Sequence, residues 1–410
     1  MIAFALRTRV RTLEAGKHER IPPLDAAVPA QHASPAHKNL ARPAGWTHPW
    51  PVHLAHLRLR DFRNYARLDV DFPQGFNVLR GDNAQGKTNI LEAIYLMATL
   101  RSFRGVGGAQ MIRHGQKGYF VGGQVVAADP HEIKMYWSAS ERRLTLDGQS
   151  VRKLTDYLGT LRVVVFCTED LQLIKGTARI RRRFLDLLLS QTHPGYLPLL
   201  QRYTTAVRSR NALLKQRVVD EMAVDGFTRE LVRLGTELAG FRRELVPGIV
   251  PLARQAYQLI ASGSEELRLE YQPSIKKDFA VELAQSQARE RTYRTTLIGP
   301  HRDDLLLLLN DRSAAQYGSE GQKRSLAIAL KMTQAEYLAN LHGSLPILLI
   351  DDVMGELDAR RRSGLLPLLQ RSHETRGQVF MTCTDENWPQ ELARDLHRWE
   401  VRAGTLQTTK

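Results

Sequence analysis

The chain has 410 residues, of which 43% are hydrophobic and 25% are charged. This composition is ordinary for a globular protein of about two domains, and it excludes a fibrous or wholly disordered chain. No apolar run approaches the roughly 18 residues that a membrane-spanning helix needs, so no membrane partner is expected. The formal net charge of +15 favours a polyanionic partner, most simply nucleic acid, although a basic composition alone does not prove one.

The cysteine content indicates a reducing compartment. The sequence holds two cysteines, Cys167 and Cys383, and both lie in apolar stretches. Disulfide scaffolds use more cysteines and form in oxidising compartments. We therefore expect two reduced core thiols in a cytoplasmic protein.

Residues 1–51 differ from the rest of the chain. They hold seven of the 18 prolines and show no periodicity of two or 3.6 residues. Such a segment buries too little apolar surface to offset the entropy lost on ordering, so we predict disorder. A second hypothesis is an over-extended gene model, because no methionine lies between Met1 and Met97 and the folded pattern begins near Val52.

Residues 52–169 are predicted to form the first part of a sheet-bearing domain, which we call the head. Apolar and polar residues alternate in HLAHLRLRDF and again in ARLDVDF, as in half-buried strands. Further strands are predicted within 118–146, with a turn at Asp147-Gly148 after them. LRVVVFC at 161–167 is typical of a buried strand.

The central motif of this part is GDNAQGKT at 81–88, which fits the phosphate-loop pattern between a short apolar strand and a helix. Its glycines let backbone N–H groups turn toward a polyphosphate, and the helix adds its positive dipole end. In such a loop Lys87 reaches the β- and γ-phosphates of ATP, and the hydroxyl of Thr88 binds Mg²⁺. The residues predicted to contact ATP here are Gly81, Asp82, Asn83, Ala84, Gln85, Gly86, Lys87, Thr88 and Asn89.

Residues 170–262 have a helical period and are predicted to form a helical arm domain. Helices are expected near 178–191, 197–217, 221–245 and 249–262, with breaks at 193–195 and 247–248 where Pro and Gly occur. Apolar heptads are not sustained, so a long coiled coil is not expected.

The arm is rich in positive charge. Ten Lys or Arg and one acidic residue lie between Lys175 and Arg217. The densest group is Arg179, Arg181, Arg182 and Arg183. This group is either a solvated helix face or a surface that follows DNA phosphates, and the sequence leaves both open.

Residues 263–410 are predicted to complete the head. Strands are expected at 267–272, 305–309 and 377–383, and helices at 320–341 and 358–370. LPILLIDD is a buried strand that ends in Asp351 and Asp352, placed to hold Mg²⁺ and to orient the attacking water, respectively. Buried strands that alternate with helices predict an α/β fold with a mainly parallel sheet, interrupted by the helical arm.

Four motifs occur in an order that resembles a known class of ATPases. The phosphate loop, SEGQ at 319–322, LLIDD at 348–352 and GELD at 355–358 follow one another as in ATP-binding-cassette (ABC) ATPases. Within that group the chain resembles the RecF family over roughly residues 53–405. The match rests on RDFRNY, LEAIYLMATLRSFR, TEDLQLIKG, RRRFLDLLLSQ, IGPHRDDL, SEGQKRSLAIALK and DDVMGELD.

The resemblance implies an ABC-type P-loop ATPase head with an inserted helical arm. It implies ATP-induced homodimerisation, slow ATP hydrolysis, binding of DNA at junctions or on duplex, and action with RecR and RecO in loading RecA at gaps. It also implies roles for single residues. Lys87 and Asp352 would be catalytic, Asp351 metal-linked, and Arg63 a nucleotide contact; Ser319, Gly321, Gln322 and Asp358 would meet the nucleotide at the dimer seam.

Some positions depart from the cassette pattern. Asp352 stands where most cassette ATPases have Glu, which suggests slow turnover. No His occurs in TCT at 382–384, near the place of the switch His of transporters. His301 and Arg302 are either functional or part of a structural ion pair. Two other classes share the motifs: a transporter subunit, which does not explain the basic arm, and a chromosome-organising ATPase, which needs a coiled coil.

Overall fold

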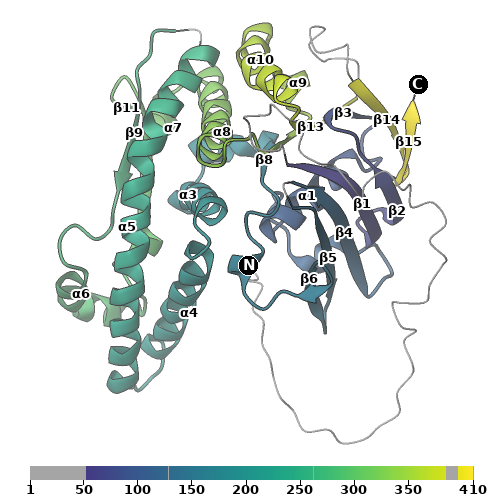
Figure 1. Ribbon diagram of the computed structural model, residues 1–410. Helices are drawn as coiled ribbons and strands as arrows, with labels where there is room; N and C mark the ends of the chain where they lie inside the picture. The colour runs from purple at the N-terminus through teal and green to yellow at the C-terminus, as the bar shows by residue number, and fades with distance from the viewer. Residues whose placement is uncertain (1–51, 128, 262, 385–395, 410) are drawn as a thin grey trace, which may run out of the picture.

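We describe residues 52–127, 129–261, 263–384 and 396–409 of a computed structural model. The disorder predicted for residues 1–51, and the alternative of an over-extended gene model, lie outside the described residues. The described chain forms two lobes, a head that holds two sheets and a mainly helical lobe (Figure 1). The termini of the described chain both belong to the head.

The first sheet of the head has the order β15-β14-β3-β13-β12-β8. All its neighbouring strands are parallel except the pair β14 and β15, so the predicted mainly parallel sheet is confirmed. Its strands are β3 (Gly75–Arg80), β8 (Val163–Phe166), β12 (Ile347–Asp351), β13 (Gln378–Cys383), β14 (Leu396–Arg402) and β15 (Thr405–Thr409). β8, β12 and β13 are buried along their length, as parallel strands covered on both faces must be.

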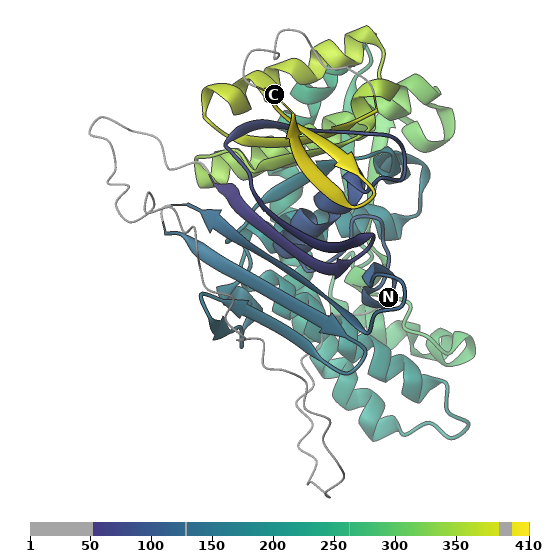
Figure 2. The ribbon, with the colours of Figure 1, turned by 90° about the vertical axis from the view of Figure 1, so that its right-hand side faces the viewer.

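The second sheet of the head is antiparallel and has the order β2-β1-β4-β5-β6-β7 (Figure 2). Its strands are β1 (His53–Phe62), β2 (Tyr65–Asp71), β4 (Gly118–Val126), β5 (His131–Ser138), β6 (Arg142–Leu146) and β7 (Gln149–Ser150). Asp147 and Gly148 both have positive φ, which confirms the turn predicted there. Helix α1 (Lys87–Thr99) lies between the two sheets, and its apolar residues join both in one core.

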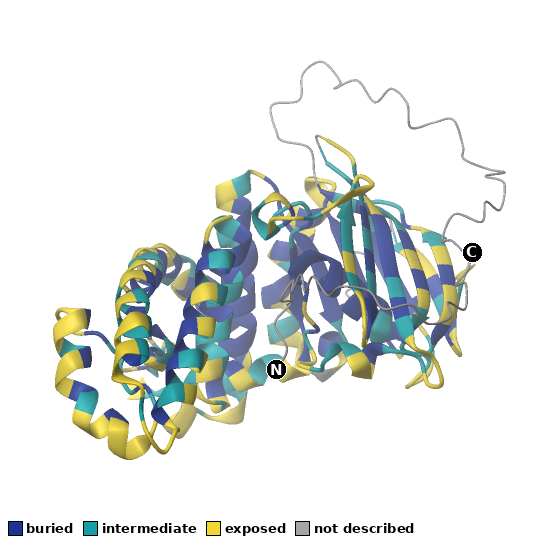
Figure 3. Ribbon diagram, turned by 90° about the horizontal axis from the view of Figure 1, so that it is seen from below, coloured by how far each residue is buried: buried dark blue, intermediate teal, exposed yellow. Residues whose placement is uncertain are grey.

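The helical lobe is built on α3 (Ala178–Thr192), α4 (Tyr196–Leu214) and α5 (Glu221–Ile260), after the short α2 (Gln172–Lys175). A small antiparallel sheet, β11-β10-β9, packs on it. The remaining elements of this lobe are β9 (Leu267–Gln272), α6 (Phe279–Tyr293), η5 (Pro300–Arg302), β10 (Asp304–Leu309), β11 (Arg312–Ser313) and α7 (Ala314–Tyr317). Buried residues gather where the lobes meet, and the outer end of the helical lobe is mostly exposed (Figure 3).

The break predicted at 247–248 is wrong, because α5 runs without interruption for 40 residues. A proline inside a helix costs about 3 kcal/mol through a lost hydrogen bond and a clash. Pro247 lies on the exposed face of α5, whereas Leu245 and Ile249 remain buried on the opposite face. Each such apolar side chain contributes about 1.5–3 kcal/mol when buried, so the continuous apolar stripe outweighs the proline.

Three helices complete the head: α8 (Glu320–His342), α9 (Val353–Glu356) and α10 (Ala359–Glu374). α8 packs along α5 and thereby connects the two lobes. Across the described ranges no helix is long and apolar enough to cross a membrane. No coiled-coil arm is found in the described part of the chain.

Candidate nucleotide site

The loop 81–86 follows the end of β3 and leads into α1, the strand–loop–helix context that the motif requires. Gly81 and Gly86 have φ values of 147° and 118°, a region that favours glycine. A Cβ on Gly81 would collide with the carbonyl oxygen of Val401, so the loop packs against β14. Gly86 caps α1 without any side-chain hydrogen bond. The N–H of Asn89 donates to the carbonyl oxygen of Gly86 at 3.0 Å, so the N–H groups of Lys87 and Thr88, nearer the helix start, are the ones placed for an anion.

Lys87 is folded back over this loop. Its Nζ donates to the carbonyl oxygens of Gly81, at 2.5 Å, and Asp82, at 2.9 Å. The side chain is 7% exposed, so its charge is held at the loop instead of in solvent. A cation held at this loop fits a polyphosphate, which would draw the ammonium group away from the carbonyl oxygens.

Contacts from two other segments hold the loop in shape. Asn64 donates from Nδ2 to the carbonyl oxygen of Gln85 at 2.7 Å, and the hydroxyl of Tyr65 donates to that of Gly86 at 3.1 Å. The backbone N–H of Ala403 donates to Oε1 of Gln85 at 2.7 Å. The side chain of Gln85 is therefore used to anchor the loop on the β14–β15 turn. Sequence reasoning missed the role of Asn64, although the RDFRNY motif that contains it was noticed.

A cluster of oxygen atoms lies beside the loop. The hydroxyl of Thr88 donates to Oδ1 of Asp351 at 2.8 Å, and the hydroxyl of Thr382 donates to the same oxygen at 2.9 Å. Burial raises the pKa of Asp351, and the two hydroxyl hydrogen bonds act against this rise. A hydroxyl and a carboxylate of this kind are the oxygen ligands that Mg²⁺ takes, so the pair fits the ion. No group of three or more metal-ligating His, Cys, Asp or Glu occurs within the described residues.

Asp352 follows in a left-handed conformation with φ of 54°. Its backbone N–H donates to Oγ1 of Thr382 at 2.9 Å, and its side chain is exposed. Thr382 thus joins both acidic residues from the end of β13, the strand between β3 and β12. The TCT segment drew attention in the sequence only because it lacks a histidine, and the bridging role of Thr382 was missed.

Ser319 begins α8 in a reciprocal capping arrangement with Gln322. The backbone N–H of Gln322 donates to Oγ of Ser319 at 3.2 Å, and the N–H of Ser319 donates to Oε1 of Gln322 at 2.7 Å. A Cβ on Gly321 would lie 2.6 Å from the guanidinium of Arg361, so a larger residue would displace that side chain. Within the described chain, the hydrogen bonds of Ser319 stay inside this first turn.

Asp358 also begins a helix, since its side chain accepts from the backbone N–H of Arg361 at 2.9 Å and caps α10. Its other carboxylate oxygen forms an ion pair with the guanidinium of Arg361. Arg361 donates in turn to Oγ of Ser325 on α8 at 3.0 Å. The two helix starts that hold Ser319 and Asp358 are therefore joined by one arginine.

Arg63 is engaged inside the head. Its guanidinium forms two hydrogen bonds with the carboxylate of Glu92, at 2.7 and 2.8 Å, and one with the carbonyl oxygen of Gln110. Glu92 is fully buried on α1 and also accepts from the hydroxyl of Ser102. In this conformation Arg63 neutralises a buried carboxylate, and a nucleotide contact by Arg63 stays a prediction.

The four arginines of α3 differ in their surroundings. Arg181 is 13% exposed and forms a bidentate ion pair with Asp304, with both N–O distances 2.8 Å. Arg182 donates to the carbonyl oxygen of Asp303 and Arg183 to that of Ser102. Arg179 is exposed. A role of this group in DNA binding stays a prediction, and the internal contacts give Arg181 a structural role in addition.

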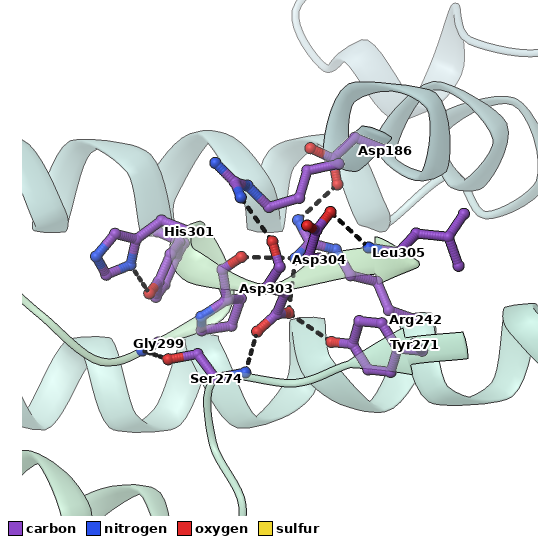
Figure 4. A network of polar contacts seen from close by, with 12 residues as sticks. Asp186, Arg242, Tyr271, Ser274, Gly299, His301, Asp303, Asp304 and Leu305 are labelled. Carbon is purple, nitrogen blue, oxygen red and sulfur yellow. Dashed lines mark hydrogen bonds and ion pairs between the residues drawn. The ribbon is translucent and has the colours of Figure 1, made fainter. Parts of the chain in front are cut away.

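The PHRDD segment forms the centre of a buried polar network (Figure 4). Arg242 on α5 pairs with Asp303 and Asp186, each at 2.8 Å, and Asp303 also accepts from the hydroxyl of Tyr271 at 2.5 Å. His301 has its Nδ1 2.7 Å from the hydroxyl of Tyr203 and its Nε2 3.1 Å from a carbonyl oxygen. Arg302 also donates to the carbonyl oxygen of Thr296. Within the described residues the ion pairs with Asp186 and Asp303 belong to Arg242, whereas His301 and Arg302 contribute hydrogen bonds, and a functional role for these two residues stays a prediction.

Comparisons with known proteins give the family. The family model described as "RecF/RecN/SMC N terminal domain" matches residues 53–405. A protein of Symbiobacterium thermophilum named "DNA replication and repair protein RecF" is 38% identical over 375 residues, which cover 87% of this chain and 98% of the relative. A protein of the same name from Halalkalibacterium halodurans is 36% identical over 372 residues and covers 87% and 99%.

Comparison with solved structures supports the same family assignment. A structure titled "recombination mediator protein RecF-ATP in RecFOR pathway" has a TM-score of 0.80 with 27% identity, and covers 89% of this chain and 99% of its own. The Smc head domain of Pyrococcus furiosus has a TM-score of 0.52 with 15% identity and therefore shares the fold alone. With a family model over nearly the whole described chain and two full-length relatives above 30% identity, the chain belongs to the RecF family, in the group of RecF, RecN and SMC P-loop ATPases.

Proposed function

We propose that this chain is a cytoplasmic, ATP-dependent DNA-binding repair protein of the RecF type, with ATP hydrolysis used as a switch. The observation that carries the ATP part is the contact of Thr88 with Asp351, which brings the phosphate loop and the acidic strand end together at 2.8 Å. The names of the relatives and of the solved RecF–ATP structure support the assignment. Action with RecR and RecO in loading RecA at gaps belongs to the same proposal.

The residues fit ATP with Mg²⁺. Backbone N–H groups and Lys87 would hold the phosphates, while Thr88 and Asp351 would hold the metal ion, which would offset negative charge on the phosphates. Asp352 is exposed beside this pair and is free to orient or deprotonate a water molecule. A carboxylate shorter than glutamate at this position fits slow turnover.

The proposal includes an ATP-induced homodimer. Ser319 lies at an exposed helix start, where the N–H groups of Glu320 and Gly321 lie between the two N–H groups used in the reciprocal cap and would suit an anion. In the described region the head offers no hydrogen bond between Ser319 and its own phosphate loop. In the proposed dimer Ser319 of one copy meets the γ-phosphate bound by the other. ATP then binds the dimer more tightly than ADP does, which is the differential affinity that a population shift requires.

The deciding experiment measures ATP hydrolysis by the full chain with and without DNA, in the absence of membranes. Stimulation by DNA is expected, and a rate that DNA does not change would contradict the proposal. Sedimentation with ATP, with ADP and without nucleotide then tests the dimer. Ser319→Arg should bind ATP normally and stay monomeric; normal dimerisation of this variant would exclude a role for Ser319 across the seam.

A further inference from the structure

A large cavity lies between the head and the helical lobe. Its volume is about 1040 Å³, at the upper end of the roughly 300–1,000 Å³ that small-ligand pockets span. The head lines it with the loop after α1 and the segment after β7, and the helical lobe lines it with α3 and α4. We call this cavity the interlobe cleft. It is separate from the phosphate loop, none of whose residues lines it.

The interlobe cleft is strongly basic. Two acidic residues line it, Asp186 and Glu230, and each is paired with a lining arginine, Arg242 and Arg202. Ten of the lining residues are Lys or Arg, and they come from both lobes. The lining therefore carries a large excess of basic over acidic side chains, which a polyanion would complement.

Among the described residues, three basic side chains without polar partners line the interlobe cleft, and they come from different lobes. Arg152 and Lys153 follow β7 in the head, and Arg208 is on α4. All three are exposed, and within the described residues their side chains form no hydrogen bond or ion pair. Like charges that face one another across a cavity repel, so holding them there costs free energy unless a ligand's negative charge lies between them.

The floor of the interlobe cleft favours nucleotides over an acidic peptide. The rings of Trp137 and Tyr119 are stacked, and the guanidinium of Arg142 lies over Trp137, 5.7 Å from the ring centroid. A guanidinium backed by an indole is a flat surface on which a base can stack, whereas a carboxylate would bind only the N–H edge of the guanidinium and leave its face unused. A cavity of about 1040 Å³ accommodates a few linked nucleotides but not the full width of a duplex.

From these observations we propose that the interlobe cleft binds a segment of single-stranded DNA through its phosphates. The inference rests on the proposed function, because it assigns a place and a strand preference to the DNA binding proposed above. Basic side chains from both lobes would contact consecutive phosphates, and the Arg142 surface would take a base. A strand bound there would connect the two lobes.

The test uses the full chain and a short labelled oligothymidine, with a duplex of the same length for comparison. The paired substitution Arg152→Ala with Lys153→Ala removes charge from the head wall, and Arg208→Ala removes it from the arm wall. The matched control is Arg229→Ala with Arg233→Ala, two exposed arginines on α5 that do not line the cleft. The dissociation constant is measured at several salt concentrations, and thermal unfolding confirms that each variant is folded.

Removal of one cation that binds a phosphate should lower the slope of log K against log salt by about 0.7 for a single strand. We therefore expect the slope to fall by about 1.4 for the Arg152/Lys153 variant, by about half of that for Arg208→Ala, and not at all for the control variant. Duplex binding should change no more in the cleft variants than in the control.

Three results would overturn the inference. Cleft variants that bind oligothymidine like the control would place the strand elsewhere while leaving DNA binding itself intact. Equal losses for duplex and single strand would remove the strand preference. Loss of affinity for an oligoglutamate peptide with oligothymidine binding unchanged would assign the cleft to an acidic protein partner. Failure of the wild-type chain to bind any DNA is a separate outcome, which rejects the proposed function.

Discussion

The nucleotide site and the Arg242 network differ in how completely the hydrogen-bonding capacity of their polar groups is satisfied. At the phosphate loop no side chain caps the first turn of α1, and a buried lysine contacts only carbonyl oxygens. In the network the guanidinium of Arg242 contacts two carboxylates, a carbonyl oxygen and a tyrosine hydroxyl. A satisfied cluster has nothing left for a ligand, so it serves the fold, whereas an unsatisfied one is available for binding.

The largest effect on stability is expected from Arg242→Ala. Arg242 is 2% exposed, and its loss leaves Asp303, which is 1% exposed, and Asp186 without their cation. Removing one partner of a buried ion pair costs about 3–5 kcal/mol. Chemical denaturation should show a loss of this size, while the exposed neighbour Arg243→Ala should stay within about 0.5 kcal/mol. A small loss for Arg242→Ala would mean that the network is not what holds the lobe together.

The second prediction concerns acid. Burial lowers the pKa of His301 to about 4, below its ordinary value of 6.5. Between those values the unfolded chain binds a proton that the folded chain does not, so stability is present above pH 6.5 and falls as the pH drops toward 4. At 1.36 kcal/mol per unit, the loss is at most about 3 kcal/mol.

His301→Gln checks this assignment. Glutamine can keep both hydrogen bonds of the ring, to Tyr203 and to the carbonyl oxygen of Thr296, but it does not titrate. Its free energy of unfolding should therefore fall less than that of the wild type between pH 6.5 and 4. Parallel profiles for the two proteins would show that His301 is not the group responsible.

The third prediction separates two arginines of α3. Arg181→Ala breaks the bidentate pair with Asp304 and should cost about 1.5–3 kcal/mol, the range for a hydrogen bond to a charged group. Arg179→Ala removes an exposed charge and should change stability by less than about 0.5 kcal/mol. DNA affinity measured on folded protein should fall for Arg179→Ala. Loss of DNA affinity by folded Arg181→Ala, with the affinity of Arg179→Ala unchanged, would contradict this assignment.

A small effect on stability, with the largest effect on function, is expected at the nucleotide site. Lys87→Met replaces a chain of similar length and should cost about 1 kcal/mol or less while abolishing ATP binding. Asp352→Asn should retain ATP binding and lose phosphate release, since it removes the charge that orients water. Equilibrium binding and phosphate release are measured separately. Normal hydrolysis by Asp352→Asn would transfer the role to another carboxylate.

The same difference explains what the sequence could predict. The phosphate loop is one contiguous segment with fixed residue types, so its strand, turn and helix could be read directly from 75–99. The partners of Arg181 and Arg242 lie 123 and 61 residues away in the chain, and no pattern in the sequence pairs them. The bridging role of Thr382 could not be predicted for a related reason, because its contacts depend on β13 lying between β3 and β12. The rule that proline breaks a helix failed at Pro247 because it ignores which face the residue occupies.

The unbroken course of α5 has a mechanical consequence. At 1.5 Å per residue its 40 residues extend for about 60 Å. One end packs along α8, the helix that begins at Ser319, and the other end carries the tip of the arm. A rigid helix of this length would act as a lever. Its end beside α8 would lie near the proposed dimer interface, and its other end would move the tip of the helical lobe. A rotation of about 5° at α8 would swing the distant tip by about 5 Å, whereas two helices with a joint at Pro247 would absorb the turn.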